Sequence, residues 1–168
     1  MKRIISAALL MVLIPMMAVA CGGDVKVTPD NGGSKLPDPE FANLGEWAVK
    51  VDSQSVVKSI MVTGQEKTEE GYVFVKVDIT ARNNMDQDSM FMLGMLTPEL
   101  DDGKGNISQY ELFVDGALDK VDCKAGETVS GSIYFKMPGD MNLVTAGMKL
   151  NMTHIGQREQ PKAEIILK

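Results

Sequence analysis

The stretch Tyr72-Val73-Phe74-Val75-Lys76-Val77-Asp78-Ile79-Thr80-Ala81 decides the fold class of this chain. Apolar side chains recur in it at every second position, which is the period of a β-strand with one buried face. Residues 129–137 repeat this alternation, and the turn residues that follow, 138–140, end the second strand. The first stretch therefore predicts a strand whose core-facing residues are Val73, Val75, Val77 and Ile79.

Six further stretches are weaker strand candidates, and none of the intervals between them shows a helical period. They are 46–52, 55–62, 90–96, 106–112, 148–155 and 163–167. Short strands separated by turn residues favour an antiparallel sandwich, because a parallel sheet would need helical crossovers. We therefore predict that residues 46–168 form one all-β domain, an immunoglobulin-like antiparallel β-sandwich of about seven or eight strands.

The N-terminus has the three parts of an export signal. Lys2 and Arg3 precede an apolar run that ends at Ala20, and Cys21 follows directly. The run is shorter than the roughly 20 residues of a spanning helix and contains a proline. The segment Ala18-Val19-Ala20-Cys21 resembles the lipobox of bacterial lipoproteins. We predict a signal peptide over residues 1–20 and lipid attachment at Cys21; a plain secretory signal is the alternative.

Residues 21–45 differ in composition from the rest, being rich in glycine, proline, asparagine and aspartate. Such a segment is typical of a flexible linker, which would let the domain lie about 25–30 Å from its anchor. The sequence thus predicts an extracytoplasmic domain, anchored by its N-terminal lipid to the cell membrane, or to the outer membrane where the cell has one.

Charge and cysteine content narrow the function classes. Removal of residues 1–20 leaves 15 basic and 23 acidic residues, a formal charge of −8. This charge disfavours nucleic acid as a partner. Cys123 is the other cysteine, so no disulfide framework is expected. It alternates with charged neighbours on a strand-like segment, which predicts a buried, inert thiol.

Three motifs carry a family resemblance: the strand from Gly71 to Asn84, the turn Leu100-Asp101-Asp102-Gly103-Lys104-Gly105, and the segment from Lys124 to Pro138. Together they resemble the telokin-like, immunoglobulin-like domain of unknown function found on bacterial lipoproteins, which is similar to the sandwich of a secreted mycobacterial antigen. The resemblance implies the fold over residues 46–168. It brings no catalytic residue and no cofactor to this sequence.

An enzymatic function finds little support in the side chains available. Nucleophilic catalysis by serine or cysteine usually needs a histidine base, and His154 is the one histidine of the chain. The acidic pairs fall on turn or alternating positions typical of solvated loops. We therefore predict no enzymatic activity.

A binding function has indirect support from three aromatic residues. Tyr72, Phe74 and Tyr134 fall on the outward register of their strands and are candidate binding residues. A cluster of exposed aromatics is typical of a contact surface, here for an envelope protein partner. The alternative is that a second packed layer covers them.

Methionine suggests another class of function, a small-ligand or copper-binding lipoprotein. Met90 and Met92, and likewise Met152 and His154, are two residues apart and would share a strand face. Thioether and imidazole ligands suit cuprous ion. The alternative is that these methionines fill gaps in the core. We assign no cofactor and no metal site from these residues alone.

Overall fold

The structure is a computed structural model that describes the backbone of residues 24–27 and 40–168 and the side chains of residues 40–168. The predicted signal peptide and the predicted lipid site at Cys21 lie outside the described residues.

Thirteen strands and one short helix make up the described part of the chain. In order they are β1 (Asp24–Val27), β2 (Ala42–Leu44), β3 (Trp47–Val57), β4 (Ile60–Val62), β5 (Gln65–Lys67), β6 (Tyr72–Asn83), β7 (Ser89–Phe91), α1 (Leu93–Leu96), β8 (Glu99–Asp101), β9 (Ile107–Gln109), β10 (Val121–Cys123), β11 (Thr128–Pro138), β12 (Lys149–Thr153) and β13 (Lys162–Ile166).

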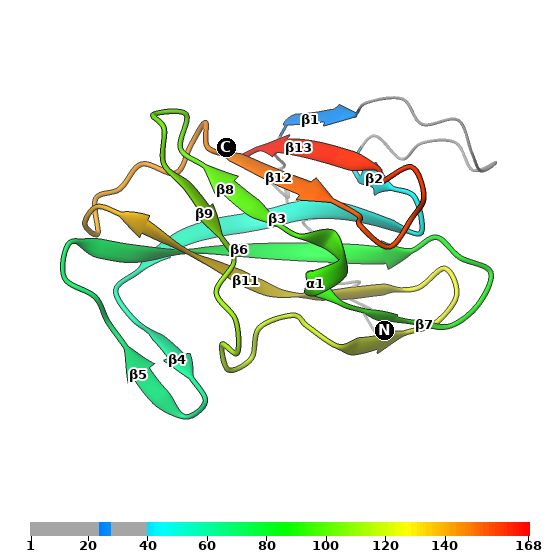
Figure 1. Ribbon diagram of the computed structural model, residues 1–168, viewed down its shortest axis with the longest axis horizontal. Helices are drawn as coiled ribbons and strands as arrows, with labels where there is room; N and C mark the ends of the chain where they lie inside the picture. The colour runs from blue at the N-terminus through cyan, green and yellow to red at the C-terminus, as the bar shows by residue number, and fades with distance from the viewer. Residues whose placement is uncertain (1–23, 28–39) are drawn as a thin grey trace, which may run out of the picture.

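Two antiparallel sheets form the two layers of the domain. One has the strand order β1-β13-β12-β8-β9 and the other β11-β6-β3-β2, and a single apolar core joins residues of both sheets (Figure 1). The predicted antiparallel β-sandwich is therefore confirmed. Many of its strands have only three residues, so the structure contains more and shorter strands than the seven or eight counted from the sequence.

The central strand β6 is the stretch that decides the fold class. It pairs with β3 on one side and β11 on the other. The predicted core residues Val73, Val75, Val77 and Ile79 are all buried. On β11, Ile133, Phe135 and Met137 are buried and Val129 is partly buried against the same core. The period-two pattern thus identifies the core-facing side of both long strands correctly.

The prediction of a strand over residues 90–96 is wrong in its second half. The chain leaves β7 after Phe91 and forms helix α1 instead. Leu93 and Leu96 are buried three residues apart, which is the spacing of one helical face. The backbone N–H of Leu93 donates to the carboxylate of Asp119 at 2.9 Å and so satisfies a free donor at the start of the helix.

The predicted linker over residues 21–45 contains two strands. β1 pairs with β13, where Asp24 lies opposite Ile166, and β2 pairs with β3, where Leu44 lies opposite Trp47. Ala42 and Leu44 are fully buried, so the core begins before the predicted boundary at residue 46. Composition alone missed these strands because each is short and lies among glycine and proline residues.

A small hairpin, β4–β5, extends away from the sandwich (Figure 1). It is fastened to the loop after β9, because the N–H of Asp115 donates to the carbonyl of Met61 at 2.8 Å and Val62 forms a bridge with Val114. The hairpin and this loop together place a second layer over part of the outer face of β6. Among residues 24–27 and 40–168, no helix has the length and apolar character needed to cross a membrane.

Candidate functional site

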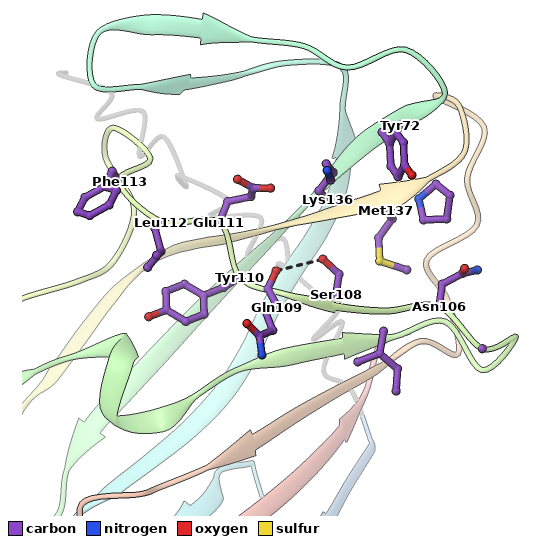
Figure 2. A pocket seen from close by; sticks show the side chains of 13 residues that line it. Tyr72, Asn106, Ser108, Gln109, Tyr110, Glu111, Leu112, Phe113, Lys136 and Met137 are labelled. Atoms are coloured by element: carbon purple, nitrogen blue, oxygen red, sulfur yellow. Dashed lines mark hydrogen bonds between the residues drawn. The ribbon is translucent and has the colours of Figure 1, made fainter.

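A groove of about 780 Å³ lies between the edges of the two main sheets, and we call it the β9–β11 groove. Residues 105–113 form one wall; Tyr72 and residues 136–138 form the other. Figure 2 shows Leu112 and Phe113 at one end of the groove, with Tyr72 and Met137 toward the other. The groove therefore lies where edge strand β9 of one sheet faces edge strand β11 of the other.

A short seam joins the two walls of the groove. Tyr110 forms an antiparallel bridge with Phe135, and the N–H of Glu111 donates to the carbonyl of Tyr134 at 2.7 Å. The segment after β9 is thereby held against β11, whereas β9 itself pairs with β8 and not with β11. Strands β9 and β11 therefore remain the edges of two separate sheets, and the groove lies between them.

Large apolar side chains lie exposed along one wall. Ile107, Leu112 and Phe113 are 64%, 54% and 73% exposed, and Tyr72 on the opposite wall is 38% exposed. Scattered exposed apolar residues are ordinary in soluble domains, but these four line one concave site. An apolar site of this kind is typical of a surface that binds another molecule.

The charged groups of the groove are paired with neighbours. The ammonium of Lys136 lies 3.1 and 3.3 Å from the two carboxylate oxygens of Glu69, and this hydrogen bonding raises the pKa of Lys136. The same ammonium lies 4.8 Å from the centre of the Tyr72 ring. Lys67 on β5 lies 2.6 Å from the Glu111 carboxylate. The walls therefore present no unpaired charge from Lys136 or Glu111.

The three predicted aromatic residues do not form one exposed cluster. Tyr72 lines the groove, but Phe74 is fully buried and forms a small core with Ile60 and Val114. Tyr134 is half-buried and packs against the same small core. The expected exposure of Phe74 is therefore wrong, because the second layer of β4 and the loop after β9 covers it.

The four predicted copper ligands divide between surface and core. Met90 and Met92 are exposed on and beside β7, whereas Met152 and His154 are buried. The Nδ1 atom of His154 lies 3.1 Å from the carbonyl oxygen of Leu44. Among residues 24–27 and 40–168, no three His, Cys, Asp or Glu side chains are grouped to hold a metal ion. The structure thus gives no observation that favours copper binding.

Cys123 is a buried free thiol, as its alternation with charged neighbours predicts. Burial raises its pKa, and the nearby carboxylates of Glu127 and Asp88 act in the same direction. The sulfur also lies 3.3 Å from the carbonyl oxygen of Glu127. These features describe a structural cysteine, since reactive cysteines have a lowered pKa and an accessible sulfur.

Sequence reasoning missed most of the groove. Ile107, Leu112, Phe113 and Lys136 were not singled out as candidate binding residues, because they come together only when β9 and β11 lie side by side. One local signal was available: Leu112 and Phe113 are adjacent apolar residues in a segment that lacks strand alternation. Consecutive exposed apolar residues are unusual enough to mark a candidate site.

Several solved structures have a similar fold. The yjhA protein of Bacillus subtilis has a TM-score of 0.56 and 13% identity, with 77% of this chain and 97% of that chain covered. A proposed lipoprotein of the same species, ycdA, has a TM-score of 0.51 and 13% identity over 76% of this chain and 38% of that chain. An uncharacterised β-sandwich protein of Clostridium difficile has a TM-score of 0.50 and 12% identity over 84% and 100%.

Identities this low show the shared sandwich fold and nothing of the function. A comparison with curated proteins finds no match. At the level of sequence, a family profile described as a domain of unknown function, DUF4352, matches residues 40–161. This range extends from just before β2 to just before β13, and so includes the whole sheet β11-β6-β3-β2, strands β8, β9 and β12 of the other sheet, and the groove. The chain therefore belongs to the DUF4352 family.

Proposed function

We propose that this protein is a lipid-anchored, extracytoplasmic interaction domain that binds a segment of another envelope protein in the β9–β11 groove. The exposed apolar wall of the groove carries the proposal. Ile107, Leu112 and Phe113 expose more than half of their surface at one concave site, opposite Tyr72. Apolar and aromatic side chains gathered in this way favour a protein contact.

The anchored location is supported by the N-terminal sequence. Ala18-Val19-Ala20-Cys21 resembles a lipobox, and two or three acyl chains on Cys21 would hold the protein stably on a bilayer. One structure with the same fold belongs to a proposed lipoprotein. The resemblance to telokin-like, immunoglobulin-like domains of bacterial lipoproteins points in the same direction.

A role without catalysis is supported by the environments of the two most reactive side-chain types. His154 is buried beside the Leu44 carbonyl. Cys123 is buried, and its raised pKa disfavours the thiolate. Neither residue lines the groove. A nucleophile and its base would need to be within hydrogen-bond reach of each other and of a substrate.

Photo-crosslinking in cells tests the groove directly. The full chain is expressed with p-benzoylphenylalanine at position 107 or 113, and with the same probe at position 90 as a matched control. Met90 is 46% exposed but lies on β7, outside the groove. We expect the two groove positions to give one dominant adduct with the same protein and position 90 to give none. Equal labelling from all three positions, or no adduct above the control, would overturn the proposal.

The anchor is tested separately by Cys21→Ser. This variant should incorporate no labelled palmitate and should leave the membrane fraction, because the thioether to the lipid can no longer form. Retention in the membrane fraction with acyl label still present would contradict lipid attachment at Cys21, whatever the groove binds.

A further inference from the structure

The start of β1 identifies the end of the sandwich that is joined to the proposed anchor. In the register of its sheet, Asp24 lies in one row with Ile166, Lys149, Asp101 and Ile107. Strands β1, β12 and β9 begin at residues of this row, and β13 and β8 end at residues of it. The row is therefore one rim of the five-stranded sheet, and the chain enters the described sandwich at this rim.

The loop between β11 and β12 lies at the same rim. It leads into Lys149, which is two strand spacings, about 10 Å, from Asp24. Figure 1 shows this loop near the C-terminus and the turn between β8 and β9. Only Gly22 and Gly23 separate Asp24 from Cys21. A lipid on Cys21 would therefore bring the rim and this loop close to a bilayer.

The loop has the composition of a surface that meets lipid. Residues 141–148 contain no charged side chain, although 24% of the residues of the chain are charged. Within them, Met141 and Val144 are 51% and 70% exposed. Apolar side chains gain free energy when they leave water, whereas a charged side chain would lose it. This loop can therefore enter a bilayer surface without dehydrating a charge of its own.

Hydrogen bonds and packing hold the loop in one conformation. The N–H of Leu143 donates to the carbonyl of Asp140 at 3.0 Å, and the N–H of Met148 donates to the carbonyl of Thr145 at 3.1 Å. The Leu143 side chain packs against the main core. The two exposed apolar side chains on either side of it are thus presented on a fixed loop, so little ordering is needed when they contact a surface.

We propose that the β11–β12 loop, residues 139–148, lies in the headgroup region of the bilayer, with Met141 and Val144 at the boundary between headgroups and acyl chains. This inference rests on the proposed anchor at Cys21 and goes beyond the proposed binding in the groove. Interfacial binding grows with the apolar area buried, and the anchor would keep the loop at a high local concentration beside the lipid. Because Ile107 belongs to the same rim, the β9–β11 groove would open beside the membrane surface.

The charges at this rim have both signs. Asp102 and Lys104 lie in the turn between β8 and β9, Asp140 begins the loop, and Lys168 ends the chain. These charges do not form a positive patch of the kind that binds anionic lipid. The contact should therefore depend on the apolar side chains and occur on a neutral bilayer.

Fluorescence quenching by spin-labelled lipid tests the proposal. The full chain, acylated in cells, is reconstituted in phosphatidylcholine vesicles with the environment-sensitive dye NBD on a cysteine at position 141, 144 or 90. Met90 is the matched control, because it is 46% exposed but lies on β7 at the other end of the sandwich (Figure 1). We expect nitroxide lipid to quench the dye at 141 and 144, with a blue shift of its emission, and to leave position 90 unchanged. The wild-type chain corrects for dye on Cys123.

A second set of variants leaves the reporter outside the two proposed contacts. The dye is placed on Ala146→Cys, an exposed position of the same loop. Met141→Asp together with Val144→Asp should abolish quenching there, because two carboxylates would have to lose water at the bilayer. Met90→Asp should retain it. Quenching that survives the double substitution, or that is lost equally in Met90→Asp, would overturn the proposal.

The outcomes separate this proposal from those on which it builds. Palmitate labelling establishes whether Cys21 carries lipid. In an acylated protein, equal quenching at all three positions or none at 141 and 144 would overturn the membrane contact and leave the anchor and the groove proposals standing. A blue shift without quenching would indicate contact with a second copy of the chain and would also overturn it. Absence of the acyl group would overturn the anchor and this contact together.

Discussion

Phe74 follows Tyr72 by two residues on the same face of β6, yet Tyr72 is 38% exposed and Phe74 is completely buried. Ile60 of the β4–β5 hairpin and Val114 of the loop after β9 pack over the Phe74 ring. One strand face therefore supports both a second small core and a wall of the β9–β11 groove.

The burial of Phe74 predicts a large loss of stability on truncation. Phe74→Ala should lower the free energy of unfolding by about 3–5 kcal/mol, because it empties the small core under the hairpin. Tyr72→Ala should lower it by less than about 1 kcal/mol, since the ring is partly exposed. Urea denaturation of both variants measures the difference. Equal losses would show that the hairpin does not cover Phe74 in solution.

Asn83 is a buried polar residue at the end of β6, and its replacement should be costly. Its amide donates to the carbonyls of Gln87, Cys123 and Lys124, and its side-chain oxygen accepts from the N–H of Met85. Asn83→Ala removes all of these hydrogen bonds from a buried site and should lower the free energy of unfolding by about 2–3 kcal/mol.

The control for this prediction is Asn142→Ala, an exposed position in the loop after β11. We expect a change within about 0.5 kcal/mol there. Urea denaturation at one pH compares the two variants, and similar losses would contradict a structural role for the Asn83 side chain.

The lowered pKa of Asp78 predicts how the free energy of unfolding depends on pH. Burial opposes the ionisation of Asp78 and so raises its pKa. The carboxylate accepts hydrogen bonds from Ser132 at 2.6 Å and Ser53 at 2.7 Å, and the Lys76 ammonium lies 2.9 Å away. These contacts outweigh the effect of burial, so the pKa of Asp78 lies below its usual value. A carboxyl group whose pKa is lower in the folded state contributes stability above its unfolded pKa. That contribution is lost as the pH falls through the folded pKa.

We therefore expect Asp78→Asn to be less stable than the wild type at pH 7 and its deficit to shrink below about pH 4. Asp122→Asn, at an exposed position of β10, should follow the wild-type pH dependence. Urea denaturation between pH 2.5 and 7 measures all three proteins. A deficit for Asp78→Asn that stays constant with pH would contradict the prediction.

Cys123 should react slowly in the native protein. Because burial and adjacent carboxylates raise its pKa, alkylation by iodoacetamide at pH 8 should be at least about 100-fold slower in buffer than in concentrated urea. Peptide mass spectrometry identifies the modified residue. A cysteine introduced by Phe113→Cys, at a highly exposed site, should react at similar rates in both conditions. Fast native labelling of Cys123 would refute its burial.

The sequence allowed the long strands and their buried faces to be predicted, because a half-buried strand repeats every two residues. β6 has twelve residues and β11 has eleven, so the alternation continues long enough to identify both strands. The turn between β8 and β9 could also be predicted from its sequence. Its two aspartates, Asp101 and Asp102, accept hydrogen bonds from the backbone N–H groups of Gly103 and Lys104. Residues close together in the sequence were sufficient to predict these elements.

The rest depends on residues far apart in the chain. α1 has four residues, which is too short to show a helical period. The cover over Phe74 comes from Ile60 and Val114, and no pattern around Phe74 indicates that they approach it. The groove needs Pro138 at the end of one strand and Ile107 on another. Its apolar wall could be suspected from Leu112-Phe113, but the opposite wall could not.

The pairing of β1 with β13 has a mechanical consequence. Only Gly22 and Gly23 separate the proposed anchor at Cys21 from the first residue of β1, a contour length of about 10 Å from Cys21 to Asp24. A lipid at Cys21 would then hold the sandwich close to the bilayer surface, with the Asp24 end of its β1–β13 edge nearest the headgroups. Opening of this four-residue pairing would therefore increase the distance that the domain can move from an anchor at Cys21.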